Sequence, residues 1–293
     1  MIKKTDYTIK ASANGKTVEL WSVKRPPFEP KGSVLEMRNE LREHLGRMHS
    51  DGASILRATY VSLETDLCDI ENVLIYNVGS YYFRNIDTHR IILERKVEQS
   101  PLLADAPADI KHYCRYEIIA ARDFSETTSD GNAIVSWKNM ILPKDLPEKL
   151  APYWLAMKKA DVTIKGSVNS GSPSYGIRLR LQVSHGTTMH ITQRMKPLLD
   201  GIISAFHVHD GTDLSEVAGR IADQVGITPD VVGNLLMEER LNVLGFKRVV
   251  VKRASGVQWS PDDHLVLYID MEVGHIVGNG AWTMEGAIFG MSP

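Results

Sequence analysis

The chain has 293 residues, of which 43% are hydrophobic, and its 34 basic and 36 acidic side chains give a formal net charge of −2. A near-neutral total argues against a general polyanion binder, and the apolar share excludes a disordered chain. The apolar runs fall well short of the ~18 residues that a membrane span requires. These values predict a globular protein of one large or two ordinary domains, with no membrane segment.

The N-terminus and the cysteines favour the cytoplasm. The segment Met1–Asp6 has no apolar stretch after its lysines, so it does not resemble a signal peptide. Cys68 and Cys114 lack any metal-ligand spacing, and two cysteines in a chain of this length are typical of reduced residues. We therefore expect a cytoplasmic protein.

In chain order, the first predicted element is a β-hairpin over residues 7–23, with its turn at Asn14-Gly15. A helix follows over residues 33–48, where Ser33 and Glu36 have the spacing of a capping box. A strand over 54–63 leads to an acidic junction and a short apolar helix that begins at Val73. Further extended segments are predicted over residues 81–97, 112–121 and 133–142.

Three prolines among charges over residues 143–152 mark a domain boundary. Beyond it, strands are predicted over 161–168 and 175–183, a helix over 202–208, a helical insertion over 212–245, and closing strands over 247–253 and 264–273. The glycine-rich tail after Gly274 is predicted to be a loop or a segment that contacts a partner.

The order of elements predicts an α+β fold of two tandem sheet-and-helix units. The N-terminal unit covers residues 1–147 and includes the acidic junction, and the C-terminal unit covers residues 148–293 and includes the insertion. Because strands, an acidic junction, a helix and more strands recur in both units, an internal duplication is one explanation of the pattern.

Carboxylates gather where the first strand-rich run gives way to the apolar helix. Asp66, Asp69 and Glu71 directly precede this helix. Acids in such a cluster can hold Mg²⁺ for phosphodiester chemistry. The simpler explanation is that Asp and Glu favour helix N-termini, where they cap free N–H groups and oppose the helix dipole. The residues alone leave both interpretations open.

The segment Asp69-Ile70-Glu71-Asn72 resembles the Asp-x-Asp-Asn element of the RusA-like Holliday-junction resolvases, with Glu71 in place of the second Asp. In that family the element opens a helix and another acid follows on a later strand, a place that Asp87 occupies here. The resemblance implies Mg²⁺-dependent cleavage of branched DNA, with Asp69, Glu71 and Asp87 as catalytic metal ligands and Asp66 as an additional ligand.

A second stretch, Lys196-Pro197-Leu198-Leu199-Asp200-Gly201, resembles the same element in a degenerate form, because it lacks the first acid and the Asn. Its distant acids are Asp262 and Asp263, which the insertion displaces along the chain. The resemblance therefore implies a second, degenerate site formed by Asp200, Asp262 and Asp263.

Basic residues are concentrated next to this second stretch. Between Lys165 and Leu199 the chain has no acid and five basic residues: Lys165, Arg178, Arg180, Arg194 and Lys196. A local basic patch can bind nucleic acid although the total charge is near zero. The alternative is an ordinary solvated strand face.

Histidines offer a rival metal site. His185, His190, His207 and His209 are close enough in sequence to bind Zn²⁺ if the chain brings them together. The alternative is that His207 and His209 lie at a helix C-terminus, where the helix dipole favours them.

Two functions follow from these patterns. The first is a metal-dependent endonuclease that acts on structured or branched DNA, with Mg²⁺ as its cofactor. The second is a non-catalytic nucleic-acid- or protein-binding subunit of a bacterial defence or recombination complex.

Overall fold

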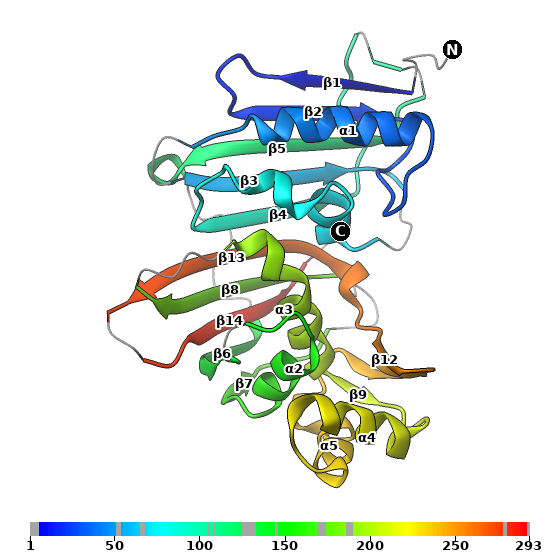
Figure 1. Ribbon diagram of the computed structural model, residues 1–293, viewed down its shortest axis with the longest axis vertical. Coiled ribbons are helices and arrows are strands. Elements are labelled where there is room, and N and C mark those ends of the chain that lie inside the picture. The colour runs from blue at the N-terminus through cyan, green and yellow to red at the C-terminus, as the bar shows by residue number, and fades with distance from the viewer. Residues whose placement is uncertain are drawn as a thin grey trace.

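The computed structural model describes residues 6–50, 54–64, 68–104, 106–107, 109–124, 133–143, 146–168, 174–185, 190–277 and 280–291. One mixed sheet of ten strands crosses the molecule, in the order β1-β2-β5-β3-β4-β13-β8-β14-β6-β7 (Figure 1). The predicted α+β class is confirmed, but the two expected units share this single sheet.

The strands of the sheet are β1 (Tyr7–Ala11), β2 (Thr17–Ser22), β3 (Ser54–Val61), β4 (Arg90–Lys96), β5 (His112–Ala120), β6 (Ala133–Ile141), β7 (Val162–Ile164), β8 (Tyr175–Ser184), β13 (Val266–Ile276) and β14 (Thr283–Gly290). Its helices are α1 (Ser33–Gly46), α2 (Ala151–Lys158) and α3 (Ile191–Ala205), with short helical turns η1 (Asn72–Tyr76), η2 (Ser80–Phe83), η3 (Ala121–Asp123) and η6 (Asp263–Leu265). None of these described helices combines the length and apolar character that a membrane crossing requires.

The two halves of the sheet have the same strand pairing. In the N-terminal half, β3 pairs in parallel with β4 and antiparallel with β5, which also pairs with β2. In the C-terminal half, β8 pairs in parallel with β13 and antiparallel with β14, which also pairs with β6. The halves join through the antiparallel pair β4–β13. This repeat is one of strand order, and an internal duplication stays a prediction. β6 precedes the expected boundary at residue 147 yet pairs within the C-terminal half.

One face of the sheet carries the helices and the main core. Leu56 and Tyr60 of β3 pack in the same apolar cluster as Leu41 of α1, and Leu179 of β8 packs in that cluster with Leu198 of α3. Because successive side chains of a strand point to opposite faces, α1 and α3 cover the same side of the sheet, as Figure 1 shows.

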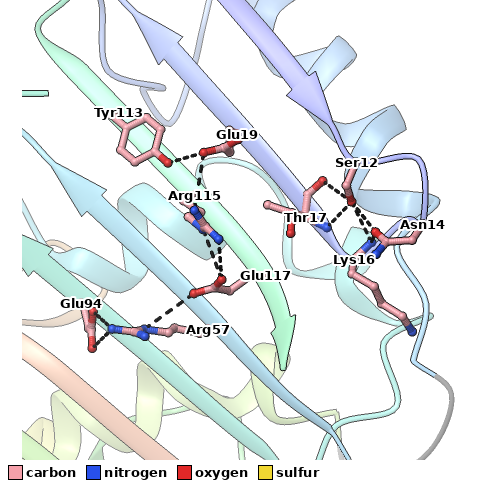
Figure 2. Close-up of polar contacts among 10 residues, drawn as sticks. All are labelled: Ser12, Asn14, Lys16, Thr17, Glu19, Arg57, Glu94, Tyr113, Arg115 and Glu117. Carbon is pink, nitrogen blue, oxygen red and sulfur yellow. Dashed lines mark hydrogen bonds and ion pairs between the residues drawn. The ribbon is translucent and has the colours of Figure 1, made fainter. Parts of the chain in front are cut away.

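The opposite face is held by ion pairs between neighbouring strands. Arg57 of β3 lies between Glu94 of β4 and Glu117 of β5, with its Nη2 2.7 Å from Glu94 Oε2, and within β5 Arg115 Nη2 lies 2.8 Å from Glu117 Oε2 (Figure 2). Tyr113 donates a hydrogen bond to Glu19 at the end of this row. Opposite charges on adjacent strands stabilise each register by roughly 0.2–1 kcal/mol.

Three predicted elements differ from the structure. The helix expected from residue 202 begins at Ile191, so Pro197 lies inside α3. The tail expected to be a loop contains β14, an inner strand of the sheet. The extended segment over 81–97 begins instead with the turn η2, and only β4 is a strand.

An insertion between α3 and η6 contains β9 (His207–His209), α4 (Leu214–Val225), α5 (Pro229–Leu236), η5 (Glu239–Leu241), β10 (Gly245–Lys247), β11 (Val250–Arg253) and β12 (Gly256–Trp259). β9 and β10 pair in parallel, and β11 and β12 form an antiparallel hairpin. We call residues 207–259 the inserted module. The helical insertion predicted over 212–245 contains two helices, and the second of them, α5, ends at Leu236.

Gly201 allows α2 and α3 to pack closely. A Cβ there would lie 2.7 Å from Tyr153 Cβ and 3.0 Å from the Leu150 carbonyl oxygen. We expect Gly201→Ala to lower the free energy of unfolding by about 1–3 kcal/mol through overpacking, although alanine normally stabilises a helix by up to about 1 kcal/mol. The control is Gly219→Ala in α4, where nothing lies within 4 Å of the added Cβ and stability should rise. Urea denaturation measures both; a gain at both positions would contradict the packing argument.

Candidate functional site

Four carboxylates surround one ammonium group at the junction of the two halves. The Lys196 Nζ lies 2.9 Å from Glu71 Oε1, 3.4 Å from Asp200 Oδ1, 3.5 Å from Asp263 Oδ2 and 3.7 Å from Asp69 Oδ2. We call Asp69, Glu71, Asp200 and Asp263 the acidic cluster. Glu71 is only 1% exposed, and the other three side chains are partly buried.

Three separate segments supply these side chains. Asp69 and Glu71 precede η1, a single π-helical turn that follows the loop after β3. Lys196 and Asp200 are one turn apart on α3, and Asp263 begins η6 directly before β13. Since residues four apart on a helix lie on one face, α3 presents both of its groups to the same place.

Local hydrogen bonds fix the cluster. The backbone N–H of Lys196 donates to the Tyr76 hydroxyl at 2.8 Å, which ties α3 to η1. Asn72 donates its side-chain amide to Asp69. Asn72 of the motif therefore orients Asp69, the first acid. Tyr76, which sequence reasoning missed, connects the two halves of the sheet at the site.

The cluster has too little positive charge for its carboxylates. If all ionise, four negative charges face the one ammonium of Lys196. Burial raises the pKa of Asp200 to about 7 and that of Asp263 to about 8, and repulsion from neighbouring carboxylates adds to both shifts. Burial likewise raises the pKa of Glu71. Burial alone would lower the pKa of Lys196, but attraction to the carboxylates outweighs it and raises the pKa.

The donor set fits a small divalent cation. One oxygen each from Asp69, Glu71 and Asp263 lies within 4.8 Å of the others. Mg²⁺ binds oxygen at about 2.0–2.1 Å, so ligands of one octahedral ion are about 3 Å apart when adjacent and about 4 Å apart when opposite. To share an ion the three oxygens would therefore move closer by up to about 2 Å, and carboxylate oxygens are the ligands that Mg²⁺ prefers. Lys196 occupies the middle of the group, so its ammonium competes with a bound cation for these oxygens.

The two sites expected from the sequence form one site in the structure. Asp69 and Glu71 of the first motif meet Asp200 and Asp263 of the second. Sequence spacing assigned Asp263 to a separate degenerate site, whereas the antiparallel pairing of β4 with β13 brings it to the first motif.

Two other expected acids lie elsewhere. Asp87 is exposed in the loop between η2 and β4, where its backbone N–H and carbonyl both hydrogen-bond to the Ser50 hydroxyl. Asp262 forms an ion pair with Lys247 and faces His207. Neither belongs to the group of described carboxylates that could share one ion. Asp66 lies outside the described residues.

The histidines do not assemble into a metal site within the described part of the chain, where the three carboxylates are the only such group. His207 and His209 lie on β9 rather than at a helix end, and His209 Nε2 lies 2.9 Å from the Thr212 carbonyl oxygen. Burial lowers the pKa of His207 to about 4. His190 precedes α3, on a different element.

The five basic residues expected to bind nucleic acid do not share one surface. Arg178 is buried with its Nε 3.2 Å from Asp270 Oδ2, and Arg180 pairs with Glu272 on the same face of the sheet, away from the helices. Lys196 lies in the acidic cluster on the helix side. Arg194 pairs with Glu148, and Lys165 is exposed after β7. These five basic residues are close in the sequence but lie in different places on the folded molecule.

The raised aspartate pKa values predict how stability depends on pH. Folded Asp200 and Asp263 hold their protons above the 3.8 of an ordinary aspartate, so the folded state binds more protons than the unfolded state and loses stability as pH rises towards 8. His207, whose pKa is lowered, acts in the opposite direction below about pH 6.5. We therefore expect the melting temperature to fall between pH 6.5 and 8, and to fall less in Asp263→Asn. Equal slopes in the two proteins would show that Asp263 does not titrate there.

No family model matches the chain, and searches of curated proteins and of solved structures found no similar protein. The resemblance of Asp69–Asn72 to the RusA-like element therefore stays a prediction.

Proposed function

We propose that the protein is a metal-dependent endonuclease with one composite site, in which Asp69, Glu71 and Asp263 bind Mg²⁺. The observation that carries the proposal is the under-compensated acidic cluster, which three distant segments of the chain build at the joint between the halves. A divalent cation would supply the charge that Lys196 alone does not. Structured or branched DNA is the proposed substrate, on the basis of the resemblance of Asp69–Asn72 to the RusA-like element.

Each residue then has a defined role. A bound Mg²⁺ lowers the pKa of water and stabilises charge on a phosphoryl oxygen. Asp69, Glu71 and Asp263 hold the ion, and Asn72 orients Asp69. Lys196, whose Nζ reaches all four acids, releases part of its contact to the cluster and donates to a substrate phosphate. Asp200 keeps Lys196 in place through their contact along α3.

The position of Lys196 also supports the alternative, a non-catalytic nucleic-acid- or protein-binding subunit. An ammonium 2.9 Å from a buried glutamate is what a purely structural ion-pair cluster would have. The two functions differ in whether a divalent cation displaces Lys196 from these oxygens. A cytoplasmic location and a DNA or protein partner are part of both proposals.

The decisive assay incubates purified protein with four-way junction, duplex and single-stranded DNA in Mg²⁺, in Mn²⁺ and in EDTA. The proposal predicts cleavage with either metal and none with EDTA, with the junction cut fastest. Binding without cleavage in every condition would support the non-catalytic subunit. If the protein neither bound nor cleaved any of these DNA substrates, the cluster would be a structural feature only.

A further inference from the structure

The inserted module contains two packed helices joined by a short turn. Three residues, 226–228, separate α4 from α5, and Gly226 has φ +69°, a left-handed conformation that glycine adopts without strain. Ile221 of α4 and Val232 of α5 are fully buried in the same apolar cluster. The helix-turn-helix motif has such a connection, a turn of three or four residues that often contains glycine.

A β-hairpin stands beside the first helix. Strands β11 and β12 pair antiparallel from Val250↔Trp259 to Arg253↔Gly256. Arg220 of α4 donates a hydrogen bond of 2.7 Å to the Gly256 carbonyl, which fastens the hairpin to the helices. Helix, turn, helix and adjoining hairpin are therefore one unit.

The second helix, α5, has an exposed face that carries both polar and apolar side chains. Asp230, Val231 and Asn234 lie on one side of α5 and are exposed, with Val231 at 44%. These residue types have partners on base edges: Asn can bond adenine through two contacts, Asp can accept from cytosine, and an apolar group can contact the thymine methyl.

The hairpin supplies the positive charge that α5 lacks. The hairpin contains two basic residues, Lys252 and Arg253, and no acid, whereas Lys247 and Arg248 precede it and form ion pairs with Asp262 and Asp213. Lys252 and Arg253 are exposed near the tip. Lys252 pairs with Glu216, also well exposed, and exposed ion pairs contribute only about 0.2–1 kcal/mol. Exchanging such a pair for a DNA phosphate therefore costs little.

We propose that the inserted module binds duplex DNA, with α5 in the major groove and the β11–β12 hairpin on the phosphate backbone. The motif places its second helix in the major groove in proteins that bind DNA. Asp263 follows the hairpin by four residues, so the module joins the sheet beside the acidic cluster. The proposal concerns binding and does not require that the cluster cuts DNA.

The test measures binding in EDTA, so that cleavage plays no part. Fluorescence anisotropy with a labelled 30-base-pair duplex pool of random sequence compares wild type with Lys252→Ala/Arg253→Ala. Each phosphate contact contributes about 0.9 to the slope of log affinity against log salt concentration, so the double variant should lower that slope by up to about 2. The control is Lys10→Ala/Arg122→Ala, which removes two exposed charges outside the module and should leave the slope unchanged.

A second readout tests the helix. Repeated selection from the pool with wild-type protein should enrich a sequence motif, and Asn234→Ala should lose the enrichment while keeping the salt slope. Equal slopes for the hairpin and control variants would overturn the proposal. The proposal would also fail if the folded protein bound no duplex DNA. That outcome would favour a protein partner for the exposed face of α5.

Discussion

Glu71→Gln and Asp263→Asn should each reduce Mg²⁺-dependent cleavage at least about 100-fold, the upper end of the loss seen when only an outer partner of a metal ligand is removed. Both substitutions keep the shape of the side chain and remove one ligand charge. Asp87→Asn should leave cleavage unchanged, because Asp87 is exposed and hydrogen-bonds to the Ser50 hydroxyl through its backbone.

Comparing Asp263→Asn with Asp87→Asn shows whether the third acid of the site is the one that the structure places there or the one that sequence spacing predicts. Circular dichroism melting of each variant checks that the fold persists. Loss of cleavage in Asp87→Asn with full activity in Asp263→Asn would show that the spacing was right and the composite site wrong.

Lys196→Met should lower the free energy of unfolding by about 3–5 kcal/mol at pH 7.5 without metal, because it leaves buried carboxylates without their cation. Added Mg²⁺ should recover part of the loss, since a ligand at 100 times its Kd stabilises the folded state by about 2.7 kcal/mol. Urea denaturation with Mg²⁺ and with EDTA measures both effects.

The matched control is Arg194→Met on the same helix. Its partner Glu148 is 88% exposed, so the loss should stay within about 1 kcal/mol. If Mg²⁺ stabilised neither variant, the cluster would not bind the ion, and the non-catalytic alternative would gain. Equal stabilisation of both variants would show that Lys196 does not compete with the ion.

Local patterns predicted most of the N-terminal half. The hairpin at Asn14-Gly15 and the helix from Ser33 follow from turn chemistry and periodicity, which act over a few residues, although the expected capping box is wrong because Gly32 is the N-cap residue. The start of α3 was missed because the stretch Lys196–Gly201 resembled a junction before a helix, whereas the helix begins at Ile191 and continues through Pro197. The strand β14 was missed because its glycines suggested a loop. Gly286 instead fits against Trp137, whose ring lies 2.4 Å from the place of a Cβ.

For the site too, local sequence patterns identified the residues but not which of them meet in the fold. The motif around Asp69 and the stretch around Asp200 both contain residues of the cluster, and their acids were identified from the sequence. Their meeting depends on the pairing of β4 with β13, which joins residues about three-fifths of the chain apart and leaves no local signal. Asp87 was preferred to Asp263 for this reason.

The most direct test of the composite metal site is isothermal titration calorimetry of Mn²⁺ and Mg²⁺ into the protein without DNA. The account predicts one ion bound by the wild type, with proton release at pH 7 because the ion displaces protons from raised-pKa carboxylates. It also predicts binding at least about 10-fold weaker in Asp263→Asn and unchanged in Asp87→Asn. No metal heat in the wild type, or equal binding by wild type and Asp263→Asn, would contradict the account.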